Sequence, residues 1–355
     1  MKVLPYTPEF EQLWNGICAN HPDAWFWHTT SWMEYSLQCR FGIQSENMSY
    51  LLLDDAEQMV YAIVPLIKET SSGISEFTYG GGPTPAPVIH AKLGEKKKKE
   101  VKQFIFECYP KLAEQNQVKR IVLRQSNRSM TEPQQSEPIY LKHAFIELPS
   151  HTSILSLRGD EDVIYQEMHD NHKWMIRKAL RLDAEVEVYD SKTITKKIMD
   201  SFWHAYFAAA GKTTRPSSSY DMWYQFIQMG NGYLFALKHC GKTLGYVYIL
   251  VYKNYAYYCM GCNLDIGQVG SQIIHWEIIK FLKVKNIAYY ELGEQIFSAN
   301  LYYPVDQKKM TICRFKRRFG GALVPQLTAE YYYSSEYMKT LWNERMEQYL
   351  QSLDT

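Results

Sequence analysis

The stretch 232–320 constrains the fold more than any other, because it alternates β-prone runs with one amphipathic helix in a fixed order. Aromatic and β-branched residues fill 233–238 and 243–251, and a glycine lies in the short turn between them, which is typical of a β-hairpin. The run 255–260 adds a third strand. Consecutive strands joined by short turns pair antiparallel, so these three runs predict a meander.

A helix and a fourth strand follow the meander. Apolar residues recur at spacings of three and four between Ile273 and Leu282, which places them on one helical face. The run 287–292 then has the composition of a strand. The helix is therefore expected to be a crossover that returns the chain to the same sheet.

The loop 265–270, just before this helix, is a candidate phosphate site. A helix N-terminus offers unpaired backbone N–H groups and the positive end of the helix dipole to an anion. Gly267 and Gly270 allow the backbone to approach such a ligand closely, and Ser271 is expected to be the N-cap. The alternative is that both glycines only shape a turn.

The first half of the chain repeats this order of elements more weakly. The repeat consists of strands at 50–53, 60–64 and 76–79, a helix around Gln103 and a strand at 119–124. Its period is longer than the roughly 20–50 residues of a solenoid repeat. A length of 355 residues also favours two domains. Two copies of one α/β domain are therefore predicted.

Patterns between the two halves place the domain boundary. A helix with a basic end is expected over 163–179 and a strand over 185–189. A further helix is expected to end at Gly211, because glycine readily adopts the left-handed conformation that closes a helix. These elements belong to the second half, so the domains are expected to be 1–150 and 151–355.

Four short motifs in the second half carry a family resemblance. They are Trp-Met-Ile-Arg-Lys-Ala at 174–179, Ala-Gly-Lys-Thr-Thr-Arg-Pro at 210–216, Tyr-Tyr-Glu-Leu-Gly at 289–293 and Arg-Phe-Lys-Arg-Arg-Phe-Gly-Gly at 314–321. In this order they resemble the Fem-type (FemA/FemB-like) family, whose bridge-forming members transfer amino acids from aminoacyl-tRNA to a peptidoglycan precursor. The resemblance implies an α/β (α+β) fold of two tandem GNAT-like domains, each a mixed, mostly antiparallel sheet flanked by helices.

The sequence departs from these families at two places. GNAT enzymes usually carry Gln/Arg-x-x-Gly-x-Gly/Ala before the crossover helix, whereas Gly267 and Gly270 stand three apart with no Gln or Arg three residues before either. No heptad-patterned insertion interrupts the second domain, so the helical-hairpin arm of some bridge-forming members is not expected. The resemblance leaves two co-substrates open, acyl-CoA and aminoacyl-tRNA, and implies no tightly bound cofactor.

Three residues are candidates for the catalysis that the resemblance implies. Aminolysis of an ester or thioester needs a deprotonated amine, a proton for the leaving group and a stabilised tetrahedral oxyanion. Glu291 is the candidate base and Tyr258 the candidate acid, while Lys316 matches the basic Phe-Lys motif of the family and is the candidate oxyanion stabiliser. The alternatives are a strand-end salt bridge for Glu291, a buried structural role for Tyr258 and a solvated basic strand for Lys316.

A second set of residues is expected to bind substrate. Arg177, Lys178 and Arg215 are candidate anchors for a diphosphate or carboxylate, since arginine grips such groups with two parallel hydrogen bonds. Thr214 adds a hydroxyl donor, and Trp32 is a candidate wall for a groove that binds a sugar or peptide. The alternative for Trp32 is a place in the core.

Composition argues against several classes of protein. With 39 basic and 38 acidic residues the net charge is +1, which gives no overall attraction to DNA or to an anionic membrane. The absence of an apolar signal segment and of any run of ~20 apolar residues predicts a cytoplasmic protein without an integral membrane segment. Seven cysteines are expected to be reduced, and Cys259 and Cys262 lack the second pair that a zinc site needs, so no metal is expected.

These observations lead to one hypothesis and two alternatives. The hypothesis is a Fem-like N-acyltransferase of the GNAT superfamily that transfers an acyl or aminoacyl group to an amine of a cell-envelope or glycan precursor. Its acceptor is a small molecule or a glycan or peptide precursor, with peripheral contact to a lipid-linked precursor as a further expectation. The first alternative is an aminoacyl-tRNA-dependent peptidoglycan-type aminoacyltransferase. The second is a non-catalytic binding module with the same fold.

Overall fold

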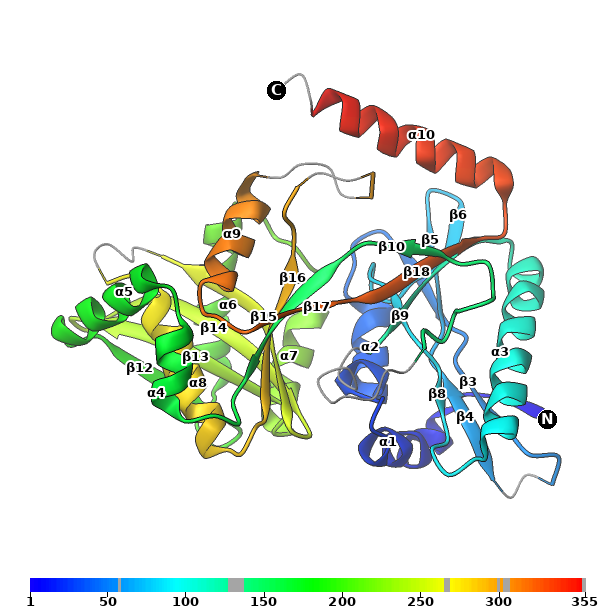
Figure 1. Ribbon diagram of the computed structural model, residues 1–355, viewed down its shortest axis with the longest axis horizontal. Coiled ribbons are helices and arrows are strands. Elements are labelled where there is room, and N and C mark those ends of the chain that lie inside the picture. The colour runs from blue at the N-terminus through cyan, green and yellow to red at the C-terminus, as the bar shows by residue number, and fades with distance from the viewer. Residues whose placement is uncertain (57–58, 127–136, 265–268, 299–300, 303–306, 353–355) are drawn as a thin grey trace. The chain divides into compact units, whose positions relative to one another are not determined.

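The computed structural model describes residues 1–56, 59–126, 137–264, 269–298, 301–302 and 307–352 (Figure 1). Helices and mixed sheets alternate along these residues, which confirms the predicted α/β (α+β) class. The chain divides into two compact units. Unit 1 contains Met1–Ser150, Ser298–Asp306 and Pro325–Thr355, and unit 2 contains His151–Phe297 and Gln307–Val324.

The end of the chain groups with unit 1, which differs from the predicted domains. The division after Ser150 coincides with the predicted boundary, but the sequence placed all of 151–355 in the second domain. Strand β18 (Leu327–Tyr332) explains the difference, because it pairs antiparallel with both β9 (Val118–Gln125) and β10 (Ile146–Leu148) of unit 1. Backbone pairing over a long sequence separation cannot be read from local periodicity.

Unit 2 is built on a seven-stranded sheet in the order β12-β13-β14-β15-β16-β11-β17. The predicted meander is confirmed as β13 (Gly232–His239), β14 (Lys242–Tyr252) and β15 (Tyr255–Asn263), which pair antiparallel. Helix α8 (Gln272–Val284) then leads to β16 (Tyr289–Gln295), which runs parallel to β15 and confirms the predicted crossover. The remaining strands are β11 (His151–Ser156), β12 (Glu185–Tyr189) and β17 (Ala322–Pro325).

Helix α8 and the sheet enclose the core of unit 2. Ile278 and Ile279 of the helix pack with Phe235, Ile249 and Tyr290 of the strands, all fully buried. This follows from the apolar helical face seen in the sequence. The other helices are α4 (Glu161–Glu167), α5 (Asp170–Arg181), α6 (Lys196–Ala210), α7 (Ser218–Gln228) and α9 (Gln307–Arg317).

Two details of unit 2 bear on the sequence interpretation. Helix α6 ends at Gly211 with φ 69°, as predicted for a left-handed glycine cap. The basic run 314–318, considered above as a strand, instead lies in and just after the last turn of α9. Basic side chains in a last helical turn interact favourably with the negative end of the helix dipole.

Unit 1 contains two sheets, ordered β1-β3-β4-β8 and β10-β18-β9-β6-β5-β2, with β7 pairing with β9. The predicted run of strands from 50 to 79 is two hairpins in different sheets, because β5, which the sequence analysis missed, pairs with β6 and starts the second sheet. Strands β6 and β9 run parallel. The strands are β1 (Lys2–Pro5), β2 (Gln44–Asn47), β3 (Tyr50–Leu53), β4 (Val60–Val64), β5 (Ile67–Ser71), β6 (Ile74–Phe77), β7 (Thr84–Pro85) and β8 (Val88–Ile89).

Helix α3 (Glu95–Gln115) is the crossover of unit 1, as predicted around Gln103. Its Val101, Ile105 and Tyr109 pack against Ile121 and Leu123 of β9. The remaining helices are η1 (Pro8–Phe10), α1 (Glu11–Asn20), η2 (Phe26–His28), α2 (Thr30–Gln38) and α10 (Ser335–Gln351). Helix α10 buries none of its residues, so its attachment to β18 depends on side chains at its surface.

Candidate active site of unit 2

The candidate site lies where the two parallel strands of unit 2 stop pairing. Parallel pairing of β15 with β16 ends at Tyr257 opposite Glu291, although both strands continue. The pairing of β15 with β14 skips Cys259, and that of β16 with β11 skips Leu292. Such bulges re-aim side chains and are common beside active sites. The backbone therefore directs consecutive side chains of both strands into one region.

Glu291 is a buried carboxylate held by two hydroxyl groups. Only 3 % of its surface is exposed. The Thr152 hydroxyl donates to one carboxylate oxygen at 2.7 Å, and the Tyr255 hydroxyl donates to the other at 3.2 Å. Burying a carboxylate is costly unless its oxygens accept hydrogen bonds. These two bonds hold the Glu291 carboxylate in one orientation.

Lys316 brings a cation to the same place from the last turn of α9. Its Nζ lies 5.0 Å from the centroid of the Tyr258 ring, within the range of a cation–π contact. Burial lowers the pKa of Lys316, and the nearby Cys313, Glu294 and Glu291 oppose this shift. The structure thus brings together all three predicted catalytic residues, Glu291, Tyr258 and Lys316.

Gly293, the last residue of the 289–293 motif, makes the room for this lysine. A Cβ on Gly293 would lie 3.3 Å from Lys316 Nζ and 3.4 Å from the Tyr257 hydroxyl oxygen. Its φ of 86° is also one that side chains disfavour. Two independent constraints therefore favour glycine at this position.

Tyr258 keeps its proton at neutral pH. Burial raises the pKa of Tyr258 above its ordinary value, so the phenol is a hydrogen-bond donor. Its ring packs edge-on against the His275 imidazole at 4.9 Å between centroids. A Cβ on Gly261 would collide with the Tyr258 hydroxyl group. Glycine at 261 therefore leaves the space that this hydroxyl occupies.

Two histidines that the sequence analysis did not single out support the lysine. Burial lowers the pKa of His275 to about 3, and burial lowers the pKa of His172 to about 4. Both rings are therefore neutral at pH 7. The His172 Nε2–H donates to the Phe315 carbonyl oxygen at 2.9 Å, directly before Lys316 in the chain. Nothing in their local sequence distinguishes these histidines from ordinary helix residues.

Arg215 and Thr214 approach the same region from the loop between α6 and α7. Arg215 Nη1 lies 3.0 Å from the Met260 sulfur, and its guanidinium lies 5.8 Å from the centroid of the Trp223 ring. Burial raises the pKa of the Cys259 thiol, and the positive charges of Arg215 and Lys316 partly oppose this rise. Both cations therefore lie within electrostatic reach of this thiol. The Thr214 hydroxyl is buried and has no hydrogen-bond partner among the described residues.

The other predicted binding residues, Arg177, Lys178 and Trp32, make different contacts. Arg177 and Lys178 are on α5, where the Arg177 carbonyl accepts from Arg181 and the Lys178 ammonium lies 5.3 Å from the Trp174 ring centroid. Neither makes a hydrogen bond or ion pair with the three candidate catalytic residues within the described part of the chain. Trp32 belongs to α2 of unit 1, where its ring lies 4.3 Å from that of Trp27.

The predicted phosphate loop is described only in part. Gly267 lies outside the described residues. Gly270 has φ 75°, and a Cβ there would collide with the Met175 side chain, so this glycine permits close packing. Ser271 occupies the N-cap position of α8 as expected, but its side chain makes no capping hydrogen bond. The α8 N-terminus therefore keeps backbone donors that its cap does not satisfy.

Two features are absent from the described residues. They contain no group of three or more His, Cys, Asp or Glu side chains that could hold a metal ion. None of their helices is both long and apolar enough to cross a membrane.

The whole chain resembles several solved structures. It matches FemX with a TM-score of 0.68 at 11% identity, covering 96% of this chain and 99% of that one. It matches L-PGS from Bacillus licheniformis with a TM-score of 0.58 at 10% identity, covering 95% and 96% of the two chains. A tandem GNAT protein from the clavulanic acid biosynthesis pathway matches with a TM-score of 0.53 at 11% identity, covering 94% and 98%.

No family model matches the sequence, and no curated protein matches it either. The likeness is therefore one of three-dimensional structure, and it extends over nearly the full length of each chain. The chain therefore shares its fold with FemX and with a tandem GNAT protein.

Proposed function

We propose that this protein is an N-acyltransferase that transfers an acyl or aminoacyl group to an amine of a cell-envelope or glycan precursor. The observation that carries the proposal is the meeting of Glu291, Tyr258 and Lys316 where β15 and β16 separate. A base, an acid and a cation are the groups that aminolysis of an ester or thioester requires. The fold shared with FemX supports this choice of reaction.

Glu291 is proposed as the base. The acceptor amine attacks the carbonyl carbon of the donor, and its proton passes to Glu291 directly or through one water molecule. Thr152 and Tyr255 already donate to the two carboxylate oxygens, so the carboxylate does not have to reorient during proton transfer. Holding both substrates in place contributes several kcal/mol to lowering the barrier, in addition to this step.

Lys316 and Tyr258 act on the two atoms that gain negative charge. These are the carbonyl oxygen of the donor and the oxygen or sulfur of its leaving group. The Lys316 ammonium stabilises the oxyanion of the tetrahedral intermediate, and its partly buried position strengthens that interaction because little water screens it. When the intermediate collapses, the leaving oxygen or sulfur takes a proton from the Tyr258 hydroxyl. The raised pKa of Tyr258 ensures that this proton is present at neutral pH.

Arg215, Thr214 and the N-terminus of α8 are proposed to hold the substrates. The buried, unpartnered Thr214 hydroxyl and the adjacent guanidinium suit a carboxylate or phosphate group. The backbone of Gly270 and Ser271 suits a phosphate of the donor. Acyl-CoA and aminoacyl-tRNA both remain candidate donors. Roles for Arg177, Lys178 and Trp32 in acceptor binding stay predictions.

A single-turnover assay tests the proposal. The protein is mixed with a panel of acyl-CoAs, and separately with charged tRNAs, in the presence of amino-sugar nucleotides and peptide precursors. Lys316→Ala should lower turnover roughly 100-fold or more with little change in substrate binding, because the oxyanion forms only along the reaction. Lys309→Ala removes an exposed lysine from the same helix and should leave turnover unchanged.

Two results would contradict the mechanism in different ways. Full activity of Lys316→Ala would remove this lysine from catalysis while leaving the reaction class intact. Absence of turnover by the wild-type protein with every donor would favour the non-catalytic binding module.

A further inference from the structure

A cavity of about 210 Å³ in unit 1 lies outside the proposed acyl-transfer site. Its polar wall is formed by Thr78, Gly81, Arg120, Thr328 and Arg345. It opens where the chain leaves the carboxyl end of β6, next to the parallel strand β9. Ligands of open α/β sheets bind at such strand ends. The question is which ligand chemistry this wall would accept.

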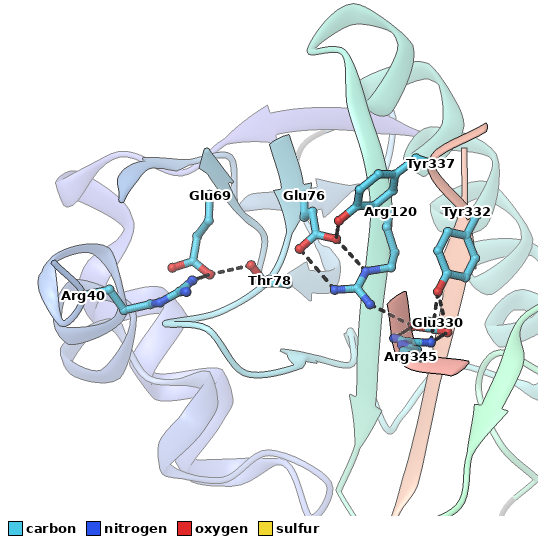
Figure 2. Close-up of polar contacts among 9 residues, drawn as sticks. All are labelled: Arg40, Glu69, Glu76, Thr78, Arg120, Glu330, Tyr332, Tyr337 and Arg345. Carbon is cyan, nitrogen blue, oxygen red and sulfur yellow. Dashed lines mark hydrogen bonds and ion pairs between the residues drawn. The ribbon is translucent and has the colours of Figure 1, made fainter. Parts of the chain in front are cut away.

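Arg120 keeps donors that no described residue uses. Its Nε and Nη2 donate to the two oxygens of Glu76 at 2.6 and 3.1 Å, and its Nη1 donates to Glu330 at 3.0 Å (Figure 2). A guanidinium carries five N–H bonds. Three of them have acceptors, so two remain without an acceptor among the described residues.

Arg345 presents a second guanidinium to the same cavity. Its Nη1 donates to Glu330 at 2.8 Å and to the Tyr332 hydroxyl at 3.2 Å, and its Nη2 donates to Glu330 at 3.1 Å (Figure 2). Of its five N–H bonds, the Nε–H and one Nη2–H have no acceptor among the described residues. Glu330 is fully buried between the two arginines. Four guanidinium N–H bonds therefore remain around the cavity.

The formal charge of this group is positive. Arg124 donates from Nε to the Thr328 hydroxyl at 2.9 Å, which adds a third arginine. Three arginines against Glu76 and Glu330 leave one positive charge. The separate pair of Arg40 with Glu69, 3.4 Å apart, is neutral and does not change the sum. The surplus charge comes from the half-buried Arg124, which reaches the cavity through its bond to the lining residue Thr328, and it favours a monoanion there.

The opposite wall of the cavity is held open by Glu69. This carboxylate, with 4 % of its residue exposed, accepts a hydrogen bond from the Thr78 hydroxyl (Figure 2). It also accepts from the Gly81 N–H at 2.9 Å. Gly81 has φ 81°, and a Cβ there would lie 2.9 Å from Arg40 Nε. The loop is therefore fixed in a conformation that favours glycine, and no side chain at 81 can fill the space.

We propose that this cavity binds an oxyanion group, a carboxylate or a phosphate, between Arg120 and Arg345. Its size accommodates one such group, whereas ligand pockets for drug-sized molecules have about 300–1,000 Å³. The ligand is thus a small anion or the anionic end of a longer molecule. This site does not depend on the acyl-transfer reaction proposed for unit 2.

Calorimetric titration of the full chain with inorganic phosphate and with acetate, at constant ionic strength in chloride, tests the site. One of the two anions should bind with one-to-one stoichiometry, and the one that does so identifies the oxyanion class. Val122→Phe places a larger side chain in the wall of the cavity while keeping every charge, and it should abolish binding. Absence of one-to-one binding for both anions would overturn the proposal.

Arg124→Gln gives a second test that leaves the glutamate–arginine pairs intact. It should weaken binding about 5- to 30-fold, as expected for the loss of one charge near the ligand at moderate effective dielectric constant. Lys119→Gln is the matched control, because it removes one charge from the same strand, whereas only Arg124 donates to the lining residue Thr328. Circular dichroism confirms folding of each variant. Equal weakening by both variants, or undiminished binding to folded Val122→Phe, would refute the site.

Discussion

Replacing Arg345 by methionine should destabilise unit 1 by about 2–4 kcal/mol. Breaking a buried ion pair by removing one partner costs about 3–5 kcal/mol, because the remaining charge is left uncompensated. Arg345→Met removes both hydrogen bonds from this side chain to the fully buried Glu330. Glu330 still accepts from Arg120 at 3.0 Å and from Tyr332 at 2.7 Å, which lowers the expected loss by about 1 kcal/mol relative to that range.

The same variant has a predicted pH dependence. Burial alone would raise the pKa of Glu330, but hydrogen bonds from Arg345 and Tyr332 and the charges of Arg345 and Arg120 lower it below its ordinary value of 4.5. A carboxylate with a lowered folded-state pKa contributes stability above pH 4.5, and this contribution is lost as pH falls through the folded-state value. The difference in stability between wild type and Arg345→Met should therefore be constant from pH 7 to about pH 5 and shrink as the pH falls below 4.5.

Urea denaturation followed by circular dichroism measures the loss in free energy of unfolding. A chain with two units need not unfold in one step, so hydrogen exchange of the β9 and β18 amides assigns the loss to unit 1. Lys339→Met is the matched control, because Lys339 is an exposed cation on the same helix. A double variant with Glu330→Gln should lose less than the sum of the two single variants. Strict additivity, or a difference that stays constant as the pH falls below 4.5, would refute the reasoning.

Two further predictions concern unit 2. Glu291→Gln should lower turnover, and the defect should become smaller at high pH, because the acceptor amine there loses its proton without a base. A pH–rate profile measures this. A defect that is independent of pH would contradict the role of Glu291 as base. Arg215→Ala should weaken binding of an anionic substrate by about 1.5–3 kcal/mol if one charged hydrogen bond is lost, as measured by calorimetry; unchanged affinity in a folded variant would exclude Arg215 as an anchor.

Much of unit 2 could be predicted from the sequence because its elements follow one another in space. The hairpin at 233–251, the third strand and the crossover helix are neighbours along the chain and in the sheet, so local periodicity was sufficient. Glu291 and Lys316 could be singled out for a related reason. Each lies in a motif with a definite place relative to these elements, and the strand that carries Glu291 follows directly from the crossover.

Other features depend on contacts that the local sequence does not encode. The support of Lys316 by His172 joins residues 143 positions apart through a backbone carbonyl group. The bond between Arg120 and Glu330 spans 210 positions. Alternating polar residues in β9 and β18 read as solvent-exposed faces, yet Glu330 is fully buried because arginines on both sides offset its charge. Strand β5 was missed since its polar residues, Lys68 and Thr70, hide its pairing.

The position of β18 between β9 and β10 has a consequence for how the protein is made. Most of unit 1 leaves the ribosome before β18, the strand that lies inside its sheet, is synthesised. The roughly 200 residues between β9 and β18 take about 10–40 s to translate at 5–20 residues per second. Throughout that time β9 presents an unpaired edge, the kind of surface on which nascent chains associate wrongly. Nascent unit 1 is therefore expected to need a chaperone, or transient pairing of its own chain, until β18 has been synthesised.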